Sequence, residues 1–491
     1  MNSNANPPVQ PLPAHNNLFL CAGALALSAV LLFLGSGLHP LWWLTWFAPL
    51  PLLLLAPRIS ARSAFAISAL AWFLGGLNMW HYLRALIEIP TILVLIFLIA
   101  PACVFAFAVL SFRSLLLRGA LWQASLAFPA WWAAYEYLYS VFSPHSTFGN
   151  LGYTQMDCLP VLQLVSLTGI WGISFCLFLL PATAAALLSK LGTRAQKTKL
   201  AVLVGLFFIS VLGYGAWRLH FTPAPEKSVN VGLMATGVGS PYPQDDAAAL
   251  QLLRSYSDQL TILAPHGTEL IVLPEKIAAV SDQATAQVDA LFESTAARMH
   301  ADILVGIDRG TATRRSNEAR LYSSDGSLAA VYDKHHLVPR FEDVDQPGTQ
   351  ITVLREPSGV WGIEICKDLD FPRLSRQYGA RGVALLIVPA WDFTLDGWLH
   401  GRMAIMRGVE SGFTIVRAAK QGVLTVSDDR GRVLAERDAA SVPFAYLFAA
   451  APVRHVATLY TRCGNWFAWA NLILLLAILV CRAKTRFSPR P

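Results

Sequence analysis

Three residues whose side chains could together perform acyl-transfer chemistry stand at or just after apolar runs in the second half of the chain. Glu275 ends "LIVLPE", Lys334 lies in "VYDKHHLVPRFE", and Cys366 ends "GIEIC". A thiol attacks a carbonyl as its thiolate, and because an isolated cysteine has a pKa of about 8.5 it needs help at neutral pH. A carboxylate can take the thiol proton, and an ammonium can stabilise the thiolate and then the oxyanion of a tetrahedral intermediate. These residue types therefore fit the roles of base, stabiliser and nucleophile.

Each of these residues also has a structural interpretation. A lone cysteine at the end of a strand is more often a small core residue, and Glu275 and Lys334 could form an ordinary ion pair. His335 and His336 suggest a base or a metal site. Adjacent residues of a strand point to opposite faces, however, so we expect structural roles for the two histidines.

The region around these residues predicts alternating strands and helices. Amphipathic stretches predict helices at 244–263, 284–299 and 397–411. Apolar, β-branched runs predict strands at 229–236, 269–275, 301–307, 360–366, 384–390, 413–419 and 422–428. Such an alternation predicts an α/β layer fold with buried sheets, in which reactive groups gather at the ends of strands.

The composition of the whole chain indicates a membrane protein. Of 491 residues, 55% are hydrophobic and 14% are charged, whereas a soluble domain has roughly 25% charged residues. The mean hydropathy is +0.47. The net charge of +7 could indicate nucleic-acid binding, but no basic patch with interleaved aromatic residues occurs, so we expect none. In a membrane protein, basic loops on the cytoplasmic side explain an excess of Lys and Arg.

Apolar runs close to the ~20 residues that span a bilayer predict a polytopic α-helical bundle of about eight spans. The predicted spans are 17–37, 41–57, 63–82, 90–111, 120–140, 160–189, 199–218 and 464–481. The predicted domains are a disordered N-terminus (1–16), a seven-span membrane domain (17–221), an α/β domain (222–460), a final transmembrane helix (461–482) and a tail (483–491).

The distribution of basic residues predicts the orientation of these spans. With the N-terminus in the cytoplasm, four basic regions fall inside: the loops around Arg58 and Arg113, the loop 190–199, and the tail. Among the short loops, the opposite side receives only Arg84. This asymmetry follows the positive-inside rule, and it places residues 222–460 outside the cytoplasm.

The order and spacing of Glu275, Lys334 and Cys366 resemble those of the nitrilase, or carbon–nitrogen hydrolase, superfamily. With seven predicted spans before this region and one after it, the chain resembles the apolipoprotein N-acyltransferase family from about residue 17 to 481. The stretches that carry the resemblance are "HPLWWLTWFAPLPLLL" (39–54), "FGNLGYTQMDCLPVLQLVSLTGIWGISF" (148–175), "KHHLVPRFE" (334–342), "GWLHGRMAIMRGVESGFTIVRAAKQGVLTVSDDRGRV" (397–433) and "TLYTRCGNWFAW" (458–469).

The resemblance implies an αββα sandwich and a role for each site residue. Glu275 would be the general base, Lys334 the oxyanion stabiliser and Cys366 the nucleophile. Glu342 would be the supporting carboxylate, and the backbone N–H of Lys367 would complete the oxyanion hole. The implied reaction transfers a fatty acyl chain from a phospholipid, through a cysteine thioester, to the N-terminal α-amine of a diacylglyceryl-cysteine apolipoprotein. We expect a monomer without cofactor or metal, in the bacterial inner membrane, with its catalytic domain on the periplasmic side.

Three stretches depart from the family pattern. The family typically reads C-Y-E where this chain has Cys366-Lys367-Asp368. A Q-G-N motif and the Trp that follows it are missing from 234–243, and S-N-D-x-W-F has become "PAWDF" at 389–393. These departures favour, as an alternative, a membrane-tethered carbon–nitrogen hydrolase or acyltransferase that uses the same triad on another substrate.

An alternative of a different class is a scaffold or transporter with a decayed domain. The intact residues Glu275, Lys334 and Cys366 argue against it. The predicted spans also lack a Gly- or Pro-broken pair that carries buried charges, a common feature of transporters.

Overall fold

The computed structural model describes residues 14–221, 225, 227–237, 239, 241–263 and 267–487. These residues form two compact units. A helical unit contains residues 14–143, 147–220 and 465–487, and an α/β unit contains 144–146 and the described residues of 221–464. Most of the N-terminus predicted to be disordered (1–13) and the last four residues of the predicted tail lie outside the described residues.

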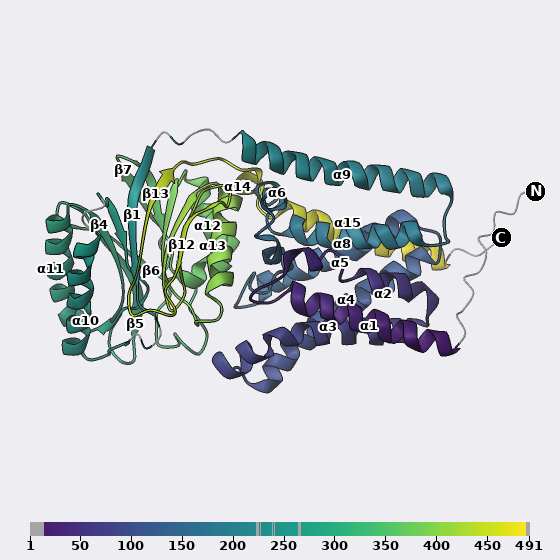
Figure 1. The fold of residues 1–491 in the computed structure, drawn as a ribbon, viewed down its shortest axis with the longest axis horizontal. Coiled ribbons are helices and arrows are strands. Elements are labelled where there is room, and N and C mark those ends of the chain that lie inside the picture. The colour runs from purple at the N-terminus through teal and green to yellow at the C-terminus, as the bar shows by residue number, and fades with distance from the viewer. Residues whose placement is uncertain are drawn as a thin grey trace, which may run out of the picture. The chain divides into compact units, whose positions relative to one another are not determined.

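The helical unit contains seven long helices (Figure 1). They are α1 (Ala14–Gly35), α3 (Ala61–Gly76), α4 (Thr91–Leu116), α5 (Leu121–Phe142), α8 (Trp171–Leu188), α9 (Arg194–His220) and α15 (Trp466–Phe487). Short helical segments join them: η1 (Trp42–Leu44), α2 (Leu50–Leu55), η2 (Ala56–Arg58), η3 (Leu77–Met79), η4 (Tyr82–Leu86), η5 (Leu151–Gln155), α6 (Leu159–Leu162) and α7 (Val165–Thr168).

Four helices of the described chain are long and apolar enough to cross a membrane: Leu18–Gly35, Thr91–Leu116, Trp171–Leu188 and Arg194–His220. Large apolar side chains on α4 and α9, such as Ile92, Ile96 and Ile209, are exposed. Apolar patches of this kind mark a surface that contacts lipid or another apolar partner. The described residues therefore contain four candidate membrane-spanning helices, whereas the sequence predicts about eight spans.

The predicted spans 41–57 and 160–189 are each broken into several short elements. The segment 41–57 forms η1, α2 and η2, because prolines at positions 49, 51 and 57 remove backbone donors and interrupt a continuous helix. The segment 160–189 forms α6, α7 and α8. Here Gly169 ends α7 at a φ of +66°, a conformation that glycine adopts readily.

The α/β unit contains two sheets. The seven-stranded sheet has the order β13-β1-β2-β4-β5-β6, with β3 paired to β4, and the six-stranded sheet has the order β12-β11-β10-β9-β8-β7. The first consists of β1 (Lys227–Ala235), β2 (Leu270–Val272), β3 (Ala279–Val280), β4 (Asp302–Gly310), β5 (Arg315–Tyr322), β6 (Leu328–Asp333) and β13 (Ala445–Val453). The second consists of β7 (Thr352–Glu356), β8 (Gly359–Ile363), β9 (Leu385–Trp391), β10 (Thr414–Lys420), β11 (Val423–Ser427) and β12 (Val433–Asp438).

Helices cover the outer face of each sheet (Figure 1). The first sheet packs against α10 (Asp246–Gln259) and α11 (Asp282–Met299), and the second against α12 (Pro372–Ala380) and α13 (Gly397–Ser411). Alternate residues of a strand serve the two faces: Leu304 lies in the core between the sheets, whereas Ile303 and Val305 pack toward the helices. The α/β prediction is confirmed, and the layers run helix, sheet, sheet, helix.

Candidate active site

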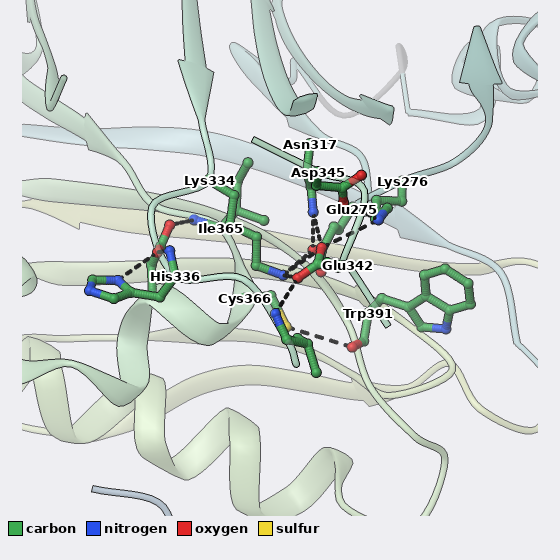
Figure 2. A network of polar contacts seen from close by, with 12 residues as sticks. Glu275, Lys276, Asn317, Lys334, His336, Glu342, Asp345, Ile365, Cys366 and Trp391 are labelled. Atoms are coloured by element: carbon green, nitrogen blue, oxygen red, sulfur yellow. Dashed lines mark hydrogen bonds and ion pairs between the residues drawn. The ribbon is translucent and has the colours of Figure 1, made fainter. Parts of the chain in front are cut away.

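The predicted site residues come from loops that follow strands of both sheets. Glu275 follows β2 and Lys334 follows β6, both in the first sheet, whereas Cys366 follows β8 of the second. The prediction that Cys366 ends a strand is wrong, because β8 stops at Ile363 and Cys366 begins the short helix η8 (Cys366–Asp370). Figure 2 shows these side chains directed toward one another.

Lys334 lies between two carboxylates. Its Nζ is 2.7 Å from Glu275 Oε1 and 2.9 Å from Glu342 Oε2, and its side chain is 1% exposed. Burial alone would lower the pKa of Lys334, but the charges of Glu275 and Glu342 raise it well above the ordinary value. Lys334 is therefore a fixed, buried ammonium.

Asn317, on β5, holds the same two carboxylates together. Its Nδ2 donates to Glu275 Oε1 at 2.6 Å and to Glu342 Oε1 at 2.7 Å. The Val338 backbone N–H donates to Glu342 Oε2 at 2.6 Å. Burial would raise the pKa of Glu342, but Lys334 and nearby donors hold it at about 2. Sequence reasoning missed Asn317, because no motif marks it and β5 was not predicted.

A second buried lysine extends the ionic network beyond Glu342. Lys276 Nζ lies 2.8 Å from Asp345 Oδ2, 3.0 Å from Asp308 Oδ2 and 3.3 Å from Glu342 Oε1. Lys276 has a φ of +46°, in the left-handed region, so the backbone turns sharply just after Glu275. Because of this turn, Glu275 and Lys276 are consecutive in sequence and yet both side chains belong to the same ionic network.

Cys366 also occupies a sharp turn. Its φ is +45°, the Asp368 N–H donates to the Ile365 carbonyl at 2.9 Å, and Cys366 Sγ lies 3.6 Å from the Trp391 carbonyl oxygen. Burial raises the pKa of the thiol well above its ordinary value, and the charge of Glu275 adds to this while Lys334 opposes it. The resting residue is a thiol that donates to a carbonyl and interacts electrostatically with both Glu275 and Lys334.

Asp368, at a position where the chain departs from the family pattern, fixes the loop that carries the sulfur. It is fully buried and accepts from Tyr332 Oη at 2.7 Å, the His336 N–H at 2.8 Å and the Ile365 N–H at 3.2 Å. The loop after β6, which contains Lys334, is thereby joined to the turn at Cys366.

Lys367 is buried as well, and the contacts of its ammonium lie outside the ionic network. Its Nζ lies 3.0 Å from His145 Nδ1 and 3.5 Å from Asp370 Oδ2. Burial and the charge of Lys367 lower the pKa of His145 to about 4, so the imidazole is neutral at pH 7 and accepts a hydrogen bond. These contacts hold Lys367, the residue that directly follows Cys366, in place.

His335 and His336 bind different partners and do not form one site together. His335 Nε2 lies 3.1 Å from the Gln350 carbonyl, and His336 Nδ1 lies 3.0 Å from Asp368 Oδ1. The His336 ring also stacks on Phe371, with centroids 3.6 Å apart. They follow β6 rather than lie on it, so the strand geometry expected for them is wrong, although each does make structural contacts.

Comparisons with known proteins show which families the chain resembles. Residues 28–183 match the family model of the apolipoprotein N-acyltransferase N-terminal domain, and residues 233–441 match that of carbon–nitrogen hydrolase. Relatives named apolipoprotein N-acyltransferase include one from Geobacter metallireducens, 27% identical across 94% of this chain and 95% of that protein. Another, from Allorhizobium ampelinum, is 28% identical across 84% of this chain and 82% of that protein.

A solved amidase of the nitrilase superfamily, from Nesterenkonia AN1, is 21% identical and covers 51% of this chain and 100% of the amidase, with a TM-score of 0.42. One family match lies mainly in the helical unit and the other in the α/β unit, and the Geobacter relative matches over nearly the full length of both chains. The chain is therefore a homologue of the apolipoprotein N-acyltransferases, with the N-terminal domain of that family followed by a carbon–nitrogen hydrolase domain.

Proposed function

We propose that this protein transfers a fatty acyl chain from a phospholipid to the N-terminal α-amine of a diacylglyceryl-cysteine apolipoprotein. The observation that carries the proposal is the buried ammonium of Lys334, held between Glu275 and Glu342 and interacting electrostatically with Cys366. A carboxylate, an ammonium and a thiol in one buried network form the set that thioester chemistry requires. The names of the relatives and the apolar helices support a lipid-anchored substrate.

The first half-reaction forms a thioester. Glu275 takes the proton of Cys366, and the sulfur attacks the ester carbonyl of the phospholipid. The Lys334 ammonium and the Lys367 backbone N–H stabilise the oxyanion. The carbon–oxygen bond then breaks, the leaving alkoxide takes the proton from Glu275, and a lysophospholipid departs. Cys366 keeps the acyl group.

The second half-reaction forms an amide. The neutral α-amine of the apolipoprotein attacks the thioester carbonyl, and Glu275 takes a proton from the attacking nitrogen. The carbon–sulfur bond breaks, the thiolate regains a proton, and the N-acylated lipoprotein leaves. Glu342, Asn317 and Lys276 hold Glu275 and Lys334 in place throughout. The division of one difficult transfer into two steps is the usual gain of covalent catalysis.

We further propose that the chain spans the bacterial inner membrane about eight times, with seven spans in 17–221 and one in 461–482. The α/β domain of 222–460 would face the periplasm, and the protein would act as a monomer. The basic residues at the start of α3, at the end of α4 and between α8 and α9 support this orientation. Reporter fusions after residues 190 and 300 test it: alkaline phosphatase should be active only in the second fusion, and the reverse result would reject the orientation.

Intact mass of the purified full-length protein tests the chemistry. After incubation with phospholipid vesicles, the protein should gain one fatty acyl mass that hydroxylamine removes, and C366A should gain none. C366S should turn over at least about a thousandfold more slowly, since the removal of a nucleophile costs more than this in other enzymes. An acyl mass that persists in C366A, or no acyl mass in the wild type, would reject the proposed thioester.

A second candidate is a membrane-tethered carbon–nitrogen hydrolase or acyltransferase with another substrate. Lys367 favours it, because this residue stands where the family typically has Tyr, and its side chain is committed to His145. Expression in cells that lack lipoprotein N-acyltransferase separates the two. N-acylated lipoprotein, seen by mass spectrometry, supports the first function, whereas a thioester without this product supports the second.

A further inference from the structure

Lys420 lies among residues from the two stretches in which the chain departs from the family pattern. Tyr242 comes from 234–243 and Trp391 from 389–393, and their ring centroids are 5.6 Å apart. Lys420 Nζ is 3.4 Å from the centroid of Trp391 and 5.3 Å from that of Tyr242. Contacts between a cation and aromatic rings at these distances are attractive, and more so away from water.

Lys420 also binds the backbone beside the proposed base. Its Nζ donates to the Lys276 carbonyl at 2.5 Å, and the residue is 1% exposed. Lys276 follows Glu275 directly and has the left-handed backbone described above. A hydrogen bond from a buried charged donor is among the stronger ones in proteins, so it fixes this turn.

Lys420 is also linked to Trp391, the residue whose carbonyl contacts the sulfur of Cys366. Trp391 pairs with Lys420 across β9 and β10, and the Trp391 carbonyl accepts the hydrogen bond from Cys366 Sγ. Trp391 Nε1 in turn donates to Gln421 Oε1 at 2.9 Å. Lys420 therefore contacts one residue adjacent to the base and another that binds the nucleophile, although these belong to different sheets.

We propose that Lys420 is a positioning residue of this active site, which holds the Glu275–Lys276 turn against the Trp391 segment and so sets the position of the base relative to the sulfur. The proposal rests on the function proposed above, since it takes Glu275 and Cys366 as base and nucleophile.

Several charged or titratable groups face Lys420. Glu275 and Asp308 are negative, Lys276 is positive, and the Tyr242 hydroxyl is bound to Asp308. Burial lowers the pKa of Lys420 to about 7, although Glu275 and Asp308 act in the opposite direction. The charge of Lys420 therefore changes within the range in which the enzyme would work.

The test follows the alkylation of Cys366 by iodoacetamide in the detergent-solubilised full-length protein, quantified on the peptide that contains Cys366. K420M keeps the length of the side chain but removes its charge and its donor. We expect alkylation about tenfold slower at pH 7, because the Glu275–Lys276 turn loses the donor that holds it, and a displaced base takes the thiol proton less efficiently. The matched control is K227M, since exposed Lys227 also donates to a carbonyl, that of Pro357, at 2.6 Å.

A second variant separates positioning from a general loss of structure. K420R keeps a cation that remains protonated at all accessible pH values. The wild-type rate should rise less steeply with pH above about 7, where Lys420 loses its proton, and K420R should not show this bend. If K420M aggregates, the comparison of wild type with K420R decides.

An alkylation rate for K420M within twofold of wild type would overturn the proposal, as would pH profiles of wild type and K420R that coincide. Alkylation needs no lipid substrate. A wild type that phospholipid fails to acylate would therefore reject the proposed function, while the alkylation results would still decide the role of Lys420.

Discussion

Asn317 Nδ2 lies 2.6 Å from Glu275 Oε1 and donates a hydrogen bond to it, while its second donor reaches Glu342 at 2.7 Å. One neutral amide thus spans two buried carboxylates that also share Lys334. Like charges at this separation repel, and both an ammonium and an amide donor offset that repulsion. Asn317 therefore fixes the orientation of the proposed base without adding charge.

We expect N317A to slow the acylation of Cys366 about tenfold, because the loss of one buried partner leaves an acceptor unsatisfied at a cost of about 1–3 kcal/mol. N317D should be slower still, since it places a third carboxylate beside Glu275 and Glu342. The appearance of the acyl mass over time measures both rates. N230A is the control: Asn230 lies on β1 of the same sheet, and its Nδ2 donates to a backbone carbonyl at the exposed surface. Equal rates for N317A and N317D would contradict the electrostatic argument.

E275Q should fold normally and form the thioester roughly 10²–10⁴-fold more slowly, the range expected when a general base is removed. The amide keeps an oxygen that can accept from Lys334 and Asn317, so the network loses a charge rather than its shape. Size-exclusion chromatography checks the fold, and intact mass checks the rate. A wild-type acylation rate in E275Q would show that another group takes the thiol proton.

Asp368 should matter for stability as well as for activity. D368A removes the acceptor of Tyr332 Oη and of three backbone N–H groups, and each buried donor left without a partner costs about 1–3 kcal/mol. Y332F removes only one of these bonds and should cost about 1 kcal/mol. The melting temperature of the solubilised protein should therefore fall more for D368A than for Y332F. D343A is the control, because exposed Asp343 also accepts from a backbone N–H; an equal fall in D343A and D368A would contradict this role.

The sequence predicts the central strands of the α/β unit well, because their apolar runs are buried on both faces. The run 384–390 matches β9, and 397–411 coincides with α13. Two of the strands that were missed, β5 and β12, carry polar residues. β5 reads "RSNEARLY", and β12, "VLAERD", is largely exposed. A strand with charged residues on one face lacks the apolar run on which the prediction depended.

The predicted Glu275, Lys334, Glu342 and Cys366 are brought together, but the residues that hold them were not predicted. Asn317, Lys276 and Lys420 act through contacts between segments far apart in the chain, and pairing of this kind leaves no local pattern in one sequence. Asp368 was recognised only as a departure from the family. Its role in fixing the Cys366 loop depends on Tyr332, His336 and Ile365, which only the fold brings close to it.

The low pKa of Glu342 predicts how stability depends on pH. Its pKa of about 2 in the folded protein lies below the ordinary value of 4.5. A carboxyl group of this kind stabilises the fold fully above pH 4.5, and the contribution is lost as the pH falls from 4.5 toward 2. E342Q has no such group. The difference in melting temperature between the wild type and E342Q should therefore be largest near pH 7 and should shrink below pH 4.5.

Asp308 also makes the stability of the wild type depend on pH, so Glu342 is judged from the difference between wild type and E342Q. Its pKa of about 6 lies above the ordinary value of 3.8, mainly because of burial, so this group contributes more stability as the pH falls from 6 to 3.8. The contribution of Asp308 is opposite in sign to that of Glu342. It is present in both proteins and cancels in the difference between wild type and E342Q. A difference that stays constant from pH 7 to pH 3 would show that Glu342 is not held ionised by Lys334 and Lys276.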